Sequence, residues 1–153
     1  MQTTHPKRGR RLGGDTDQSL VTVGLVTFAV LQLALGLFMA VSPHAFYKQI
    51  GPFGAFNSHY IRDVATFYLA IGVGLALAVR QRSWRVPVLA LTTVQYTLHS
   101  LNHLLDIGKA HPAWTGYFDF FSIAAASALL AWLLYVALND RAHAEPKVIP
   151  EVQ

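Results

Sequence analysis

The chain has 153 residues, the length of one domain, and a formal net charge of +4. Hydrophobic residues make up 53% of it and charged residues only 13%, which excludes an ordinary soluble globular domain. The chain has no cysteine, which also excludes disulfides, thiolate metal sites and a catalytic thiol.

Residues 1–19 are polar and basic without hydrophobic periodicity, which predicts a disordered cytoplasmic tail. Residues 20–42 form the first apolar segment, which is long enough to cross a hydrocarbon core of about 30 Å. A signal peptide is the alternative interpretation, because basic residues precede the apolar run. The run is longer than the usual hydrophobic region of a signal peptide, so a retained membrane span is favoured.

Residues 43–60 are expected to form a loop at the membrane interface, because they contain five aromatic side chains of the kind that concentrates there. The second span is expected over residues 61–80 and opens with Arg62 and Asp63. Two pairs of small residues in this span have the four-residue spacing that lets helix backbones approach closely: Ala70 with Gly74, and Gly72 with Ala76.

Two further spans are expected, over residues 86–107 and 117–138, with a short basic turn before the first of them. Pro87 lies near the start of that span, where its missing N–H has no cost. Residues 139–153, with mixed charge and two prolines, are expected to be a tail. The chain as a whole predicts an all-α fold, an antiparallel up-down-up-down four-helix transmembrane bundle.

Lysines and arginines are distributed unevenly between the two sides of this expected bundle. Nine lie in the two tails and the turn between the second and third spans, whereas only Lys48, Arg62 and Lys109 lie on the opposite side. Because cytoplasmic loops carry the excess of basic residues, both termini are expected in the cytoplasm. The protein is thus expected in the cytoplasmic (inner) membrane, with the lipid bilayer around it. This topology accounts for the basic residues, and no nucleic-acid partner is expected.

A polar stripe runs along the third expected span. At about 100° per residue its members fall on one helical face, within an arc of roughly 100°. Ionisable side chains within a membrane are rare and costly and mark function by default. This face is therefore expected to line a pocket in the interior of the bundle. The stripe comprises Thr92, Gln95, His99, Asn102, His103 and Asp106.

Acidic and basic residues at the ends of neighbouring spans are expected to extend this pocket. Antiparallel packing brings the start of the second span, the end of the third and the start of the fourth to the same depth. Arg62, Asp63 and Asp119 are thus expected near His103 and Asp106, at the outer side of the bundle. The alternative is that Arg62, Asp63 and Asp119 cap helix ends and form interhelical hydrogen bonds.

His99 and His103 have a spacing that metal sites use, with two imidazoles on one helical face, and Asp106 continues this face as a third ligand or a partner. Such nitrogen and oxygen ligands favour Zn²⁺, Cu²⁺ or Fe. Ser100 stands where a zincin has its glutamate. Proton transfer and hydrogen bonding in the interior are alternative roles for the pair. No catalytic residue is assigned.

The entry to the second span resembles that of the small four-helix DoxX-like membrane proteins of bacteria. It consists of Asn57, then Ile61-Arg62-Asp63, and then a helix rich in glycine and alanine. The layout of the spans is similar over most of the chain, and specific residues are similar over 57–74. Some members of this group are linked to quinone-dependent oxidoreductases, so the resemblance implies a redox-associated role with a quinone. It implies no catalytic residue in this chain.

Three functions fit these residues. The first is a pocket that binds a hydrophobic small molecule, such as a quinone or a lipid, or a divalent metal, in a redox-associated role; whether the protein is an enzyme is left open. The second is a noncatalytic accessory subunit whose polar stripe contacts a membrane protein partner or another copy of the chain. The third is a transporter or proton pathway, which requires an oligomer because four spans are few for alternating access.

Overall fold

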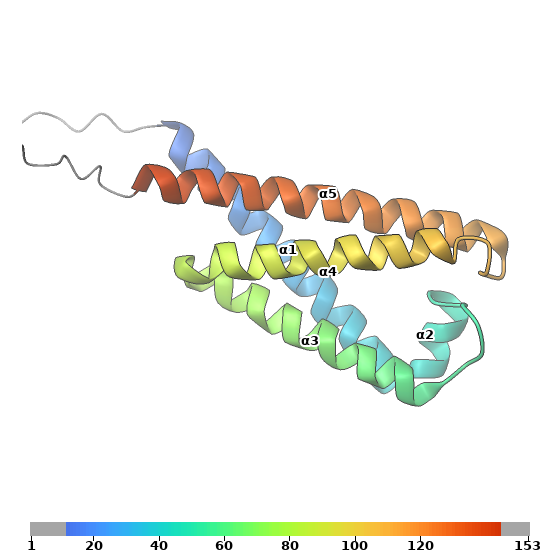
Figure 1. The fold of residues 1–153 in the computed structure, drawn as a ribbon. Coiled ribbons are helices and arrows are strands. Elements are labelled where there is room, and N and C mark those ends of the chain that lie inside the picture. Colours follow the sequence, from blue (N-terminus) through green and yellow to red (C-terminus); the bar gives the residue numbers. More distant parts are fainter. Residues whose placement is uncertain (1–11, 145–153) are drawn as a thin grey trace, which may run out of the picture.

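The computed structural model describes residues 12–144, and this part of the chain is almost entirely helical. It contains five helices and no strand, and one isolated β-bridge joins Phe53 to Ala110. The helices are α1 (Leu12–Val41), α2 (Pro43–Gln49), α3 (Ser58–Arg80), α4 (Arg82–Leu105) and α5 (Ala113–Ala144) (Figure 1).

The expected four-helix transmembrane bundle is wrong. Among the described residues there are five helices, and three of them are long and apolar enough to cross a membrane: Thr16–Val41 in α1, Ser58–Arg80 in α3, and Ala113–Ala142 in α5. α4 has 24 residues against 23 in α3, so its polar stripe, rather than its length, separates it from these three. The fifth helix, α2, occupies the expected loop. It begins at Pro43, a residue that suits the first position of a helix.

Helices extend into both of the expected tails. α1 begins at Leu12, inside the expected N-terminal tail, and α5 continues to Ala144, inside the expected C-terminal tail. The rest of these two tails, 1–11 and 145–153, lies outside the described residues. The three membrane-length helices indicate a membrane-embedded protein, and large apolar side chains on their outer faces agree with this: Val30 is 62% exposed and Phe67 68% exposed.

Local signals set the ends of α3 and α4. The Asn57 side chain caps α3 by accepting hydrogen bonds from the backbone N–H groups of His59 and Tyr60, at 3.0 and 3.2 Å. A single residue, Gln81, separates α3 from α4. The basic turn expected between two spans is therefore mostly the first turn of α4, and Pro87 lies inside that helix.

The four long helices form two main pairs, α1 with α3 and α4 with α5. In the first pair Leu33 lies against Gly72, and Leu69 lies against Gly36. A Cβ atom added to Gly72 would lie 2.8 Å from Cγ of Leu33, so these glycines allow the two backbones to approach closely. The pairs also contact each other, through α3 with α4 and through α1 with α5.

The two pairs lie close together at one end of the molecule and diverge toward the other (Figure 1). At the close end the start of α1, the turn between α3 and α4, and the end of α5 come together. We call this the arginine end, after Arg80, Arg82, Arg85 and Arg141. The opposite end carries α2, residues 50–57 and the connection between α4 and α5 (Figure 1). We call it the histidine end, because His99 and His103 lie in the last two turns of α4, which lead to it.

Candidate functional site

A cavity of about 540 Å³ lies toward the histidine end, between the two diverging helix pairs. Side chains from all five helices line it, and the segment after α2 contributes Ile50, Gly51 and Phe53. Most of the lining is aliphatic or aromatic. The hydroxyl, imidazole and carboxyl groups in the lining come from Tyr60, Tyr68, Tyr96, His99, His103, Asp119 and Ser122.

α4 presents its histidines to this cavity because of its helical period. Leu89, Thr92, Tyr96 and Ser100 are buried at spacings of three or four residues, and His99 and His103 border the same face. The Thr92 hydroxyl donates to the carbonyl of Val88 at 2.8 Å, so it is satisfied within its own helix.

His99 forms a link between two helices. Its Nε2 lies 3.4 Å from the hydroxyl oxygen of Tyr68 on α3, and either group can be the donor, depending on the imidazole tautomer. The His99 and His103 rings stand edge to face, with centroids 4.7 Å apart and an interplanar angle of 88°. Tyr68, His99 and His103 therefore form one continuous polar group on the cavity wall.

His103 lies at the end of this polar group and contacts the segment that follows α2. The Phe53 ring meets the His103 ring edge to face, with centroids 4.9 Å apart. Phe53 is itself held by its β-bridge to Ala110, just after α4. Nδ1 of His103 is buried, with almost no accessible surface, and has no hydrogen-bond partner within the described chain. It is therefore an unsatisfied polar atom of this side chain.

α5 supplies the one carboxyl group of the cavity wall. Asp119 is half-buried and lies one helical turn before Ile123, which also lines the cavity. Ser122 lies beside it, with its hydroxyl donating to the carbonyl of Asp119 at 3.1 Å. The wall thus offers imidazole and hydroxyl groups from α3 and α4 and a carboxyl group from α5.

The other polar residues expected in the pocket lie elsewhere. Asp63 is exposed and pairs with His59 at 3.4 Å. Asp106 follows the end of α4 and forms a 2.6 Å ion pair with Lys109. Asp63 therefore pairs within α3 and Asp106 pairs within the turn after α4, and neither residue lines the cavity.

Arg62 of α3 and two members of the stripe, Asn102 and Gln95, also lie outside the cavity wall. Arg62 is exposed, with its Nε 3.4 Å from the carbonyl of Ala40 on α1. Asn102 is exposed, because its position on α4 is one residue away from the buried face. Gln95 is half-buried, and its Oε1 has no partner among the described residues.

The structure does not assemble the expected metal site. No group of three or more metal-ligating side chains occurs between residues 12 and 144. His99 and His103 are adjacent, but Asp106, the expected third ligand, is engaged by Lys109. The imidazole pair alone does not match the three or four protein ligands of a typical zinc centre.

Two residues of the site, Tyr68 and Phe53, were not expected from the sequence. Tyr68 lies in the middle of an apolar span, where a hydroxyl group calls for a partner, and its four-residue spacing from Val64 places both on the cavity face. Phe53 had no comparable signal, because its place beside His103 depends on how the segment after α2 folds over the end of α4.

No protein family model, characterised protein or solved structure matches the chain. The functional argument therefore rests on the cavity and on the residues that line it.

Proposed function

We propose that this protein is a multi-pass membrane protein that binds a hydrophobic small molecule in the cavity between its two helix pairs. The observation that carries the proposal is the cavity itself, about 540 Å³ with mainly apolar walls and one polar group formed by Tyr68, His99 and His103. Ligand pockets have typical volumes of about 300–1,000 Å³ and combine apolar walls with a few convergent polar groups.

A quinone is the first ligand to test, and a lipid with a hydrogen-bonding headgroup is the second. The carbonyl oxygens of a quinone accept hydrogen bonds, which Tyr68 and an imidazole N–H can donate. The isoprenoid chain of a quinone matches the aliphatic remainder of the wall, which includes Leu31, Leu35 and Ile123. The resemblance to DoxX-like proteins favours the same ligand. In this proposal the imidazoles orient the head of the ligand and can exchange a proton with it.

The bilayer provides the route of entry. Tyr60 and Val64 of α3 and Phe118 of α5 line the cavity and are also exposed, at 67%, 45% and 62%. Their outer faces contact the acyl chains of a surrounding bilayer, so the cavity wall continues to the lipid-facing surface. A ligand that partitions into the membrane can therefore enter from the side.

The first test fills the cavity without changing its charge. In Ala126→Leu the added atoms project into the cavity, whereas in Ala125→Leu, the matched control, they project from an exposed position on the same helix. Binding of decylubiquinone to the purified protein, followed by thermal shift and titration, should weaken about tenfold or more in Ala126→Leu and stay unchanged in Ala125→Leu. Equal binding by both variants would reject the cavity as the site.

The second test removes the polar group and keeps the shape. Tyr68→Phe should weaken decylubiquinone binding by about threefold to tenfold, because one neutral hydrogen bond contributes about 0.5–1.5 kcal/mol. Tyr135→Phe, an exposed tyrosine of α5 outside the cavity, is the control and should bind as the wild type does. If lipid is retained instead, mass spectrometry of organic extracts from the wild type and from Ala126→Leu will identify it.

The proposal extends to orientation and location. We propose that the arginine end faces the cytoplasm and that the protein lies in the cytoplasmic (inner) membrane. Nine lysines and arginines belong to this end and to the tails that continue from it, against three at the histidine end, and the positive-inside rule assigns the richer side to the cytoplasm. The cavity would then open in the outer half of the bilayer.

A further inference from the structure

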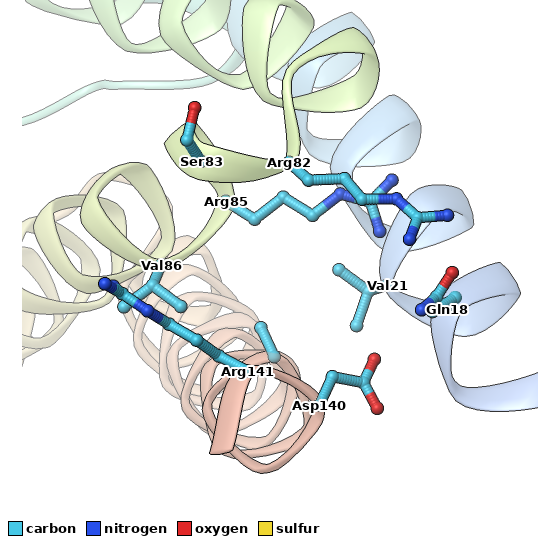
Figure 2. Close-up of a pocket in the computed structure, with 9 residues that line it drawn as sticks. Gln18, Val21, Arg82, Ser83, Arg85, Val86, Asp140 and Arg141 are labelled. Atoms are coloured by element: carbon cyan, nitrogen blue, oxygen red, sulfur yellow. The ribbon is translucent and has the colours of Figure 1, made fainter. Parts of the chain in front are cut away.

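A second cavity, of about 320 Å³, lies at the arginine end, opposite the cavity just described. The start of α1, the first turn of α4 and the end of α5 enclose it (Figure 2). Its charged lining consists of Arg82 and Arg85, whose guanidinium groups lie near each other, one carboxylate, Asp140, and Arg141, whose side chain extends away from these two arginines toward Val86 (Figure 2). The cavity therefore has an excess of positive charge, whereas its other side chains include the apolar Val21 and Val86.

Arg85 holds a fixed place in this cavity. Its guanidinium donates to the Thr22 hydroxyl on α1 at 2.9 Å and to the carbonyls of Ala78 and Val79 at the end of α3, at 3.3 and 3.5 Å. These bonds join three helices at one point. They also fix one positive charge at the cavity wall before any ligand arrives, which lowers the conformational cost of binding.

Arg82 adds a second positive charge next to the first. Figure 2 shows its side chain extending toward α1 and Gln18, beside the guanidinium of Arg85, and the charges of the two arginines act on each other. The Arg82 side chain forms no hydrogen bond or ion pair with the described residues. Asp140 makes no salt bridge with either arginine, but its negative charge acts on Arg85 and offsets part of the positive charge there. Two neighbouring positive charges, of which Arg85 is fixed by hydrogen bonds, attract an anion.

The guanidinium groups indicate the chemistry of that anion. Arginine presents a planar fork of N–H donors that matches the oxygens of a phosphate group, and such charge-assisted hydrogen bonds are about twice as strong as neutral ones. Basic pockets between membrane helices on the cytoplasmic side suit anionic lipid headgroups. The apolar Val21 and Val86 beside the arginines provide contacts for the glycerol and upper acyl region of a lipid.

We propose that the cavity at the arginine end binds a phosphate group, carried either by an anionic lipid or by a small phosphorylated compound. Arg85 forms the fixed part of the site, and Arg82 closes on the phosphate from the side of α1. The proposal is independent of the ligand in the cavity at the histidine end, since the two cavities share no residue.

The test measures lipid binding to the full-length protein by native mass spectrometry. The probes are phosphatidic acid, which has an anionic headgroup, and phosphatidylcholine, whose headgroup carries no net charge. We expect the wild type to bind one phosphatidic acid about tenfold more tightly than phosphatidylcholine. Arg82→Gln should weaken phosphatidic acid binding about tenfold, because it removes the charge-assisted bonds of one guanidinium.

Arg80→Gln is the matched control. It removes the same charge from the neighbouring last turn of α3, but Arg80 does not line the cavity. Its binding of phosphatidic acid should stay within twofold of the wild type. Equal weakening in Arg80→Gln and Arg82→Gln would overturn the proposal, because binding would then reflect diffuse charge rather than a site. Unchanged binding in Arg82→Gln would overturn it as well.

Two further measurements complete the test. Arg82→Lys keeps the charge and loses the planar fork, so it should weaken binding about threefold, and it serves in place of Arg82→Gln if that variant is not folded. Inorganic phosphate at millimolar concentration, added to the wild type, separates the two sources of the ligand. Displacement of phosphatidic acid supports a small phosphorylated compound, whereas retention of a lipid that depends on Arg82 supports the lipid.

Discussion

Gln32 of α1 is the largest buried polar side chain of the interior. It has no exposed surface, and neither its Nε2 nor its Oε1 has a hydrogen-bond partner in the described part of the chain. Its neighbours along the helix, Phe28 and Ala29, belong to the apolar core. An amide buried without partners carries a desolvation cost of about 1–3 kcal/mol. Gln32 therefore lowers the stability of the protein.

The first prediction concerns this amide. Gln32→Met keeps the length of the side chain and removes both polar atoms, so it should raise the free energy of unfolding in detergent by about 1–3 kcal/mol. Gln32→Glu, the control, should lower it because a charge would then be buried. Thermal melts of the purified variants measure both effects. A loss of stability in Gln32→Met would show that the amide finds a partner in the folded protein.

The second prediction concerns the bond between Tyr68 and His99. His99→Leu leaves the Tyr68 hydroxyl without its partner at 3.4 Å, so it should reduce stability by about 1–2 kcal/mol. In the double variant His99→Leu/Tyr68→Phe neither polar atom is left unpaired, and part of that loss should be recovered. The coupling free energy from the double-mutant cycle should be about 0.5–1.5 kcal/mol. If the losses of stability in the two single variants simply add up in the double variant, the hydrogen bond between Tyr68 and His99 does not contribute to stability.

At the scale of elements, α1 and α3 contact each other closely at two leucine–glycine pairs. Leu33 lies against Gly72, and Leu69 lies against Gly36, so each helix supplies one leucine and one glycine. The atoms that a Cβ at Gly72 would meet include the backbone nitrogen of Leu33, at 3.1 Å. A backbone atom cannot move aside as a flexible side chain can. The separation of the two helices is therefore limited by these glycines.

The third prediction uses two glycines of α3. Gly72→Ala should reduce stability by about 1–3 kcal/mol, because the new methyl group would push α1 and α3 apart. Gly74→Ala is the control, since its Cβ would meet Val88 at an ordinary 3.6 Å. It should be neutral or raise stability by up to about 1 kcal/mol through helix propensity. Chemical or thermal unfolding of the two variants under identical conditions gives the comparison. Similar effects of the two substitutions would contradict the close contact at Gly72.

At the scale of the whole molecule, the two helix pairs are joined at the arginine end and separate toward the histidine end. Arg85 bridges α1, α3 and α4 at the joined end, and Gly24 lies against Leu133 where α1 meets α5. The divergence leaves room for the larger cavity, which α2 and the segment with Phe53 cover. One end is thus a structural junction, and the other is the proposed binding site.

The fourth prediction concerns the orientation of these two ends. The chain has no cysteine, so single cysteines can be introduced at Gln81 near the arginine end and at Ala55 near the histidine end, both exposed. A membrane-impermeant maleimide added to intact cells should label Ala55→Cys but not Gln81→Cys. Gln81→Cys should be labelled only after the cells are permeabilised. The reverse pattern would place the arginine end outside and contradict the proposed orientation.

The helical class and three of the four expected apolar spans followed from the sequence, because a long apolar segment requires apolar surroundings. The helical period also placed His99 and His103 on one face of α4. The four-helix bundle was wrong for local reasons. Residues 43–49 fold into α2 although an interfacial loop was expected there, and the polar stripe leaves α4 less apolar than the other long helices.

Local pairs engaged two of the acids expected in the pocket, and only the tertiary structure decided which residues join the histidines there. Asp63 and Asp106 have the charge and spacing expected of the pocket, but His59 and Lys109 lie within three or four residues of them and pair with them. Tyr68 and Phe53 come to the histidines from distant parts of the chain. A periodic pattern within one helix fixes the direction of a side chain, whereas its partners depend on how other segments pack around it, and that packing is set by many weak contacts at once.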